Sequence, residues 1–212
     1  MNAQRYLAFV ESLHTWLYEH IKDPSDSQPK HIIDRLLRGL ENHVEWYISD
    51  GMVHELVVLE DLAERSNLVD LLIGYTGNQV TRGPVGKIRQ LGKHHKFWKH
   101  WTDMGFPCVE HVRPISEIRQ ALIKNHPSLY LKKYHELSSR SRTLAAVNLL
   151  DVMKKSPICL ITRSEDKRII KNKRGDDPWM SYDSPITGEK INRKLIRNDN
   201  LPCKNDVVMV LS

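Results

Sequence analysis

The chain has 212 residues, of which 40% are hydrophobic and 27% charged, a composition typical of a globular protein that excludes wholesale disorder. No apolar run in the sequence reaches the length that spans a bilayer, so no membrane span is expected. The first residues lack the basic and apolar segments of a secretory signal, and the three cysteines are widely spaced. These features predict a cytoplasmic protein with reduced thiols at Cys108, Cys159 and Cys203.

Charge divides the sequence near residue 70. Residues 1–70 hold 6 Lys and Arg against 13 Asp and Glu, whereas residues 71–212 hold 26 against 13. No acid occurs between residues 71 and 102. We therefore expect an acidic helical region over 1–75, available to a protein partner, and a basic region over 76–212. The basic region predicts contact with the phosphates of DNA or RNA.

Helices are predicted throughout the first region. Apolar residues at steps of three and four predict an amphipathic helix over 2–21 and a second over 31–48, separated by a proline-containing loop. Asp50 and Gly51 predict a turn, and the apolar positions of 52–73 predict two helices or one broken helix. The buried face of the first helix is expected to comprise Val10, Leu13, Leu17 and Ile21.

The basic region predicts short elements of both kinds, so the expected fold is α+β, dominated by helices, with a small sheet in the last two-thirds. Strands are predicted at 106–114 and 156–163, and a last one at 207–212. Residues 176–183 predict a turn anchored by aromatic side chains. Helices are predicted at 129–137, at 139–155 and at 115–125, where Ile115, Ile118 and Leu122 are expected to face inward and Ile123 is a fourth candidate.

The segment 77–101 begins rich in glycine and ends basic and aromatic. Cations bind phosphate, while aromatic rings stack on bases or bury in the core. We assign the cations to phosphate, and Trp98 and Trp101 to the core of an amphipathic helix. No GKS or GKT follows the glycines, which excludes a nucleotide-binding loop of that type. The phosphate-binding candidates of this segment are Arg82, Lys87, Arg89, Lys93, Lys96 and Lys99.

Four possible zinc ligands fall close together in the sequence. Their order, His95, His100, Cys108 and His111, superficially resembles a closed tetrahedral set. Structural zinc sites usually pair two close-spaced ligand doublets, and one cysteine among histidines matches that pattern poorly. Zinc is therefore not expected.

The residues Val-Glu-His-Val-Arg-Pro at 109–114 resemble the first strand of HNH nucleases, where an acidic–His pair precedes a small apolar residue and a proline. The resemblance implies that His111 is the general base that activates water. It implies that Glu110 holds or positions a divalent cation, either Mg²⁺ or Mn²⁺. A neutral imidazole can accept a proton near pH 7, and the metal would stabilise charge on the phosphate. The central Asn of the family would be Asn148.

The strand at 156–163 is followed by Ser-Glu-Asp-Lys. Glu165 and Lys167 resemble the second half of the PD-(D/E)xK nuclease motif, which implies that Glu165 and Asp166 bind a metal and that Lys167 stabilises the attacked phosphate. The same residues fit a helix start in which Ser164 is the cap and the acids complement the helix dipole, and we prefer this interpretation. The helix would carry four further phosphate-binding candidates, Arg168, Lys171, Lys173 and Arg174.

Three functions follow from these patterns. The first is a metal-dependent, HNH-like nuclease that hydrolyses DNA or RNA phosphodiesters. The second is a non-catalytic DNA- or RNA-binding regulatory protein with the same basic surface. The third is a protein-interaction module that uses the acidic helical region. The first requires His111 and the carboxylates at 165–166 to meet, which only the fold can decide.

Overall fold

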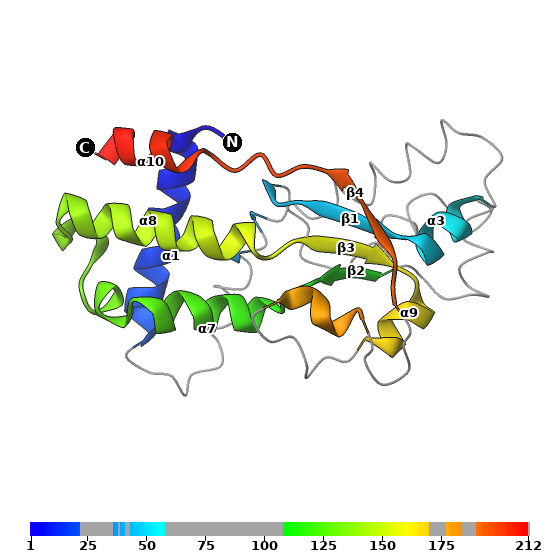
Figure 1. Cartoon of the computed structure of the whole chain (residues 1–212). Helices are drawn as coiled ribbons and strands as arrows, with labels where there is room; N and C mark the ends of the chain where they lie inside the picture. The colour runs from blue at the N-terminus through cyan, green and yellow to red at the C-terminus, as the bar shows by residue number, and fades with distance from the viewer. Residues whose placement is uncertain are drawn as a thin grey trace, which may run out of the picture. The chain divides into compact units, whose positions relative to one another are not determined.

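The computed structural model has an α+β fold in which helices dominate, as Figure 1 shows, and this confirms the predicted fold class. The segment 77–101 and residues 58–73 of the helical pattern expected over 52–73 lie outside the described residues. The structure describes residues 1–21, 36–37, 39–40, 43–57, 108–169, 177–183 and 190–211.

The chain divides into two compact units, each assembled from separate stretches of sequence. The helical unit comprises Met1–Val44, Arg113–Ser156 and Asp199–Ser212, and the sheet unit comprises Glu45–Val112 and Pro157–Asn198. By sequence, the helical unit holds 15 Lys and Arg against 11 Asp and Glu, and the sheet unit holds 17 against 15. The charge contrast along the sequence is therefore not a contrast between units, because each unit combines residues from both sides of position 75.

The first helix of the helical unit, α1 (Ala3–Ile21), forms where the apolar periodicity predicts it. Its apolar face packs against α8 (Ser139–Lys154) and α10 (Lys204–Leu211). At the amino end of α1 the Tyr6 hydroxyl donates a hydrogen bond to the Ala146 carbonyl of α8 at 2.7 Å. The buried residues of this face include Val10, Leu13 and Leu17, as expected.

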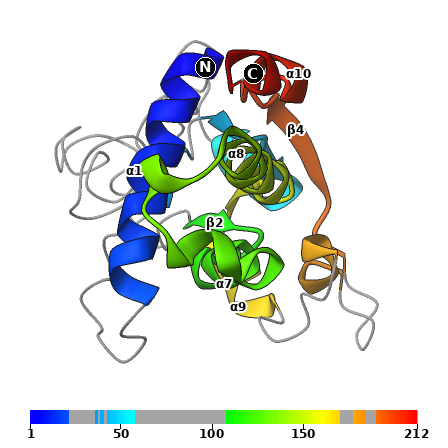
Figure 2. The ribbon, with the colours of Figure 1, turned by 90° about the vertical axis from the view of Figure 1, so that its left-hand side faces the viewer.

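The helices α7 (Ile115–Asn125) and α8 run side by side, seen nearly end-on in Figure 2, and both match the predicted ranges. The segment 129–137, predicted as a helix, instead forms two 3₁₀ turns, η3 (Pro127–Leu131) and η4 (Tyr134–Glu136). Lys132 and Lys133 between the turns have extended backbone, which interrupts the hydrogen bonding that one helix would need. The buried residues of α7 are Ile115, Ile118 and Leu122, as predicted, whereas the fourth candidate, Ile123, is half-buried.

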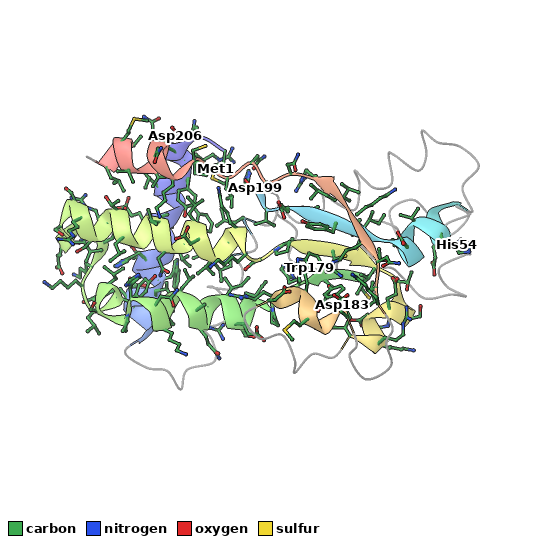
Figure 3. The ribbon with its side chains drawn as sticks, in the orientation of Figure 1. Met1, His54, Trp179, Asp183, Asp199 and Asp206 are labelled. Carbon is green, nitrogen blue, oxygen red and sulfur yellow. The ribbon has the colours of Figure 1, made fainter. Side chains whose placement is uncertain are left out.

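The last element, α10, corrects the strand expected at 207–212. Its β-branched and apolar residues favour a strand by intrinsic preference, but that preference is weak relative to packing. Within α10, Val207 is fully buried where the helix packs against α8 and α1. The start of the chain lies beside the segment that leads into α10, where the Met1 ammonium donates to the Asn200 carbonyl at 2.6 Å (Figure 3).

A buried amide ties α7 to α8. The Asn148 side chain of α8 is 5% exposed, and its Nδ2 donates to the Leu122 carbonyl of α7 at 3.1 Å. Its Oδ1 accepts a hydrogen bond from Asn125 Nδ2 at 3.2 Å. The residue that the HNH resemblance designates as the central Asn therefore joins two helices of the helical unit.

We predict that Asn148→Ala lowers the free energy of unfolding by about 1 to 2 kcal/mol, because it leaves a buried carbonyl and an amide without their partner. Chemical denaturation with circular dichroism checks this value. Leu144→Ala, on the same helix but 40% exposed, is the matched control and should change the free energy by less than about 0.5 kcal/mol. Equal losses in the two variants would contradict the structural role of the amide.

The sheet has four strands in the order β2-β3-β1-β4. The central strands β1 and β3 are parallel, β4 is antiparallel to β1, and β2 is antiparallel to β3. All four residues of β3 are buried, as a continuous apolar run in a central strand requires. The bounds are β1 (Trp46–Ser49), β2 (Cys108–His111), β3 (Ile158–Ile161) and β4 (Arg193–Arg197).

The strand β1 is the largest correction to the predicted elements. The helix expected over 31–48 cannot include residues 46–48, which pair with β3 on one side and β4 on the other. Trp46 and Ile48 are buried, and alternate aromatic and β-branched residues suit a central strand. Asp50 and Gly51, expected in a turn, instead begin the helix α3 (Asp50–Val57).

Aromatic rings gather around Arg193 in the sheet unit. The guanidinium carbon of Arg193 lies 4.0 Å from the ring centroid of Trp179 in the 3₁₀ turn η5 (Pro178–Ser181). Its Nη1 also lies 3.3 Å from Asp183 Oδ1. Tyr182 packs edge-on against Trp179, with centroids 5.1 Å apart. The predicted turn with aromatic anchors is thus confirmed, and it fixes the start of β4.

Candidate functional site

The predicted catalytic pair lies in β2, at an edge of the described sheet. Glu110 pairs with Cys159 of β3, and His111 pairs with Ile158, the first residue of that strand. Both side chains are half-buried. The predicted strand at 106–114 is confirmed for the four residues of β2.

Glu165 occupies a buried hydrogen-bonding site where β1 and β3 end. Its Oε2 accepts hydrogen bonds from Ser49 Oγ at 2.6 Å, from the Thr162 backbone N–H at 2.9 Å and from Thr162 Oγ1 at 3.1 Å. The side chain is 5% exposed. One carboxylate oxygen therefore satisfies three donors and joins the ends of two parallel strands.

The same residue forms the capping box of α9 (Arg163–Arg168). Thr162 Oγ1 accepts from the Glu165 N–H at 3.1 Å while the Glu165 carboxylate returns to the Thr162 N–H. The predicted helix start is correct in kind, but the cap is Thr162 instead of Ser164, whose hydroxyl lies 2.9 Å from Thr162 Oγ1. A capping box satisfies two otherwise unpaired amide groups.

The neighbours of Glu165 are closer to solvent. Asp166 faces Arg163, with Oδ2 and Nη1 3.7 Å apart, and Lys167 and Arg168 are exposed. An exposed ion pair of this length contributes little to stability. The remaining candidates of this helix, Lys171, Lys173 and Arg174, lie outside the described residues, as do Arg82, Lys87, Arg89, Lys93, Lys96 and Lys99.

The strand register separates His111 from the acids at 165–166. His111 pairs with the first residue of β3, whereas Glu165 and Asp166 follow the last residue of that strand. Four strand residues span about 10 Å between their first and last Cα atoms. Within the described residues, no three His, Cys, Asp or Glu side chains are grouped so that they could hold one metal ion.

A different set of cations comes together in the helical unit. Because α7 ends and α8 begins at the same end of their hairpin, the segment 124–142 concentrates there. This segment holds five Lys and Arg and one acid, Glu136. Four of its cations are exposed, and we call them the hairpin cations: Lys124, Lys132, Lys133 and Arg140.

The single acid of the segment, Glu136, is engaged in the turn η4. The Glu136 Oε2 accepts a hydrogen bond from the Lys133 backbone N–H at 3.2 Å, which uses the carboxylate to close the turn η4. Its Oε1 faces His135, 3.9 Å from Nε2. The acid is therefore used in the turn, and the four cationic heads give this end of the hairpin a net positive charge.

The start of α8 adds to the positive character. Ser138 caps the helix by accepting a hydrogen bond from the Ser141 N–H at 3.2 Å, and the first turn contains no acid. The amino end of a helix carries a partial positive charge and unpaired amide groups, so it favours anions. A cation such as Arg140 at that end is unfavourable in isolation, and a bound anion would offset the repulsion.

The excess of cations over 124–142 is visible in the sequence, but the predicted phosphate-binding candidates did not include this segment. In the structure Lys132 and Lys133 lie between the two 3₁₀ turns, and both side chains are exposed. Leu131, 65% exposed, lies beside them.

No helix within the described ranges is long and apolar enough to cross a membrane. No protein-family model, curated protein or solved structure matches the chain significantly.

Proposed function

We propose that this protein binds nucleic acid, DNA or RNA, and that the hairpin cations contact the phosphate backbone. The observation that supports the proposal is the concentration of four exposed cations at the end of the α7–α8 hairpin, around one acid that the turn η4 uses. Lys and Arg side chains that neutralise phosphates release counterions, which supplies most of the affinity of sequence-independent binding.

The binding role is favoured over the nuclease role by the environment of Glu165. A carboxylate that accepts three buried hydrogen bonds is engaged in joining β1, β3 and α9. His111, the base that the HNH resemblance implies, lies in β2 beside the opposite end of β3.

The three free thiols suit a reducing compartment, so we propose that the protein acts in the cytoplasm.

The test compares Lys132→Gln/Lys133→Gln with Lys154→Gln/Lys155→Gln in the full chain. The control removes the same charge at the other end of α8, about 20 Å away along the helix. Fluorescence anisotropy with labelled single- and double-stranded DNA and RNA measures affinity over a series of salt concentrations. We expect the first variant to bind roughly tenfold more weakly, and the salt slope to fall by about 1 for each phosphate that is no longer neutralised.

Two outcomes would overturn the proposal. Equal losses of affinity in both variants would show that net charge alone matters and that the hairpin is no interface. If none of the four probes binds at low salt, the proposal fails and the protein-interaction function remains. Cleavage of a probe with Mg²⁺ or Mn²⁺, abolished in His111→Ala, would instead establish the nuclease.

A further inference from the structure

A buried histidine of α1 holds the turn that precedes the hairpin cations. His14 is 2% exposed, and its Nε2 lies 2.9 Å from the Leu129 carbonyl of η3. Because a carbonyl oxygen only accepts hydrogen bonds, the Nε2 carries the proton and donates it. Leu129 stands three residues before Lys132, so this contact fixes the chain close to the cationic side chains.

The other ring nitrogen of His14 makes the contact sensitive to acid. Its Nδ1 is buried and has no hydrogen-bond partner among the described residues. Protonation would place a charged ring and an unsatisfied donor in the protein interior, both of which cost free energy. Burial lowers the pKa of the imidazole, and the hydrogen bond to Leu129 opposes part of that shift.

The groups around the ring do not compensate a positive charge. Tyr130 of η3 and Tyr134 of η4 contact the imidazole with centroid distances of 5.2 and 5.3 Å. Burial raises the pKa of Tyr134; Glu11 of α1 adds to that shift and Arg142 of α8 opposes it. Burial raises the pKa of Tyr6 of α1, and the charge of Asp151 of α8 raises it further. None of these carboxylates is a cause of the pKa shift of His14. That shift comes from burial, which lowers the pKa, and from the hydrogen bond to Leu129, which raises it.

We propose that His14 is a positioning residue for the hairpin cations, and that its protonation releases the segment 127–137 from α1 and weakens nucleic-acid binding. This proposal rests on the proposed function, because it concerns how nucleic-acid binding by the hairpin cations is regulated. The released state would keep the cations but lose their fixed arrangement, so each phosphate contact would carry an added ordering cost.

The pH window follows from the direction of the shift. An unfolded or released His14 has an ordinary pKa of about 6.5, and the docked ring has a lower one. Above about pH 6.5 both states are neutral and docking is at full strength. As the pH falls below 6.5, the released state takes up the proton first, so docking weakens until the pKa of the docked ring is reached.

The first arm of the test measures docking without nucleic acid. Amide hydrogen exchange of the segment 127–137, corrected for the intrinsic rate at each pH, is compared in wild type, His14→Gln and His20→Gln. The Gln side chain can donate to the Leu129 carbonyl but does not titrate, whereas His20 is a half-buried control on the same helix whose ring packs on Trp16. Between pH 7.5 and 5.5, protection should fall in wild type and His20→Gln, by at most about tenfold per pH unit, and stay nearly constant in His14→Gln.

The second arm measures affinity over the same pH range with the probe that binds best. Effects of pH that do not involve position 14 are common to wild type and His14→Gln, so the informative quantity is the ratio of wild-type Kd to His14→Gln Kd. We expect this ratio to be about 1 at pH 7.5 and roughly threefold or more at pH 5.5. A pH-dependent loss of protection with a constant ratio would confirm the His14 contact but show that the hairpin is not the binding surface.

Equal pH profiles of protection in wild type and His14→Gln would overturn the proposal. If His14→Gln does not fold, as judged by circular dichroism, an NMR titration of the His14 ring in the wild-type protein decides the matter. A midpoint clearly below 6.5, accompanied by shifts in the amides of 127–137, supports the proposal. A midpoint at or above 6.5 excludes it.

Discussion

Replacing Glu165 by alanine is expected to lower the free energy of unfolding by about 2 to 4 kcal/mol. The substitution removes the acceptor of Ser49 Oγ and of both the backbone and hydroxyl donors of Thr162. Those three donors belong to buried residues at the ends of β1 and β3, and each would lose its acceptor. Urea denaturation of the full chain, followed by circular dichroism, measures the change.

Two further variants at α9 separate hydrogen bonding from charge. Glu165→Gln keeps an oxygen acceptor in place and should lose clearly less stability than the alanine variant. Lys167→Ala, exposed on the same helix, should change the free energy by less than about 0.5 kcal/mol. A Glu165→Ala protein as stable as wild type would contradict the structural role and favour a ligand-binding role for this carboxylate.

Replacing Gly51 by alanine is expected to lower the free energy of unfolding by about 2 kcal/mol, because the new methyl group collides with Glu165. A Cβ at position 51 would lie 2.5 Å from Glu165 Oε1 and 2.8 Å from its Cδ. The other carboxylate oxygen, Oε2, accepts three hydrogen bonds, so the carboxylate can move away only by breaking them. The same denaturation experiment measures this loss.

The two substitutions should not be additive. In the Glu165→Ala background the obstructing carboxylate is gone, and Gly51 lies in the first turn of α3. Ala is favoured over Gly in helices by up to about 1 kcal/mol, so Gly51→Ala should then be neutral or slightly stabilising. A double-mutant cycle would give a coupling energy of about 2 kcal/mol. Additive losses would show that Gly51 is needed for a reason other than room for Glu165.

Elements with a local signal were predicted correctly from the sequence. The helices α1, α7 and α8 have apolar stripes of helical period that are buried, and their ends lie within two residues of the expected ones. The strand β3 is a short apolar run with β-branched residues, buried at every position. In these segments local preference and tertiary burial favour the same structure, which is why pattern alone suffices.

The errors fall where local preference and tertiary packing disagree. Residues 46–49 continue a helical pattern but complete a sheet between β3 and β4. The valines of α10 favour a strand, yet the segment packs as a helix against α8 and α1. Pairing partners come from distant parts of the chain, so no window of sequence around residue 48 or 208 contains the information that decides their structure.

The sequence by itself determined that this is a helix-dominated α+β protein with an excess of cations and a capped helix after its central strand. It also supplied Glu110, His111 and Glu165 as candidate site residues, but it did not single out the hairpin cations. Only the tertiary structure decided how those residues are used. The register of β2 on β3 places His111 away from Glu165, and two parallel strand ends bury that carboxylate among donors. The turn between α7 and α8 gathers cations that are separate in the sequence, because helix ends meet only after packing.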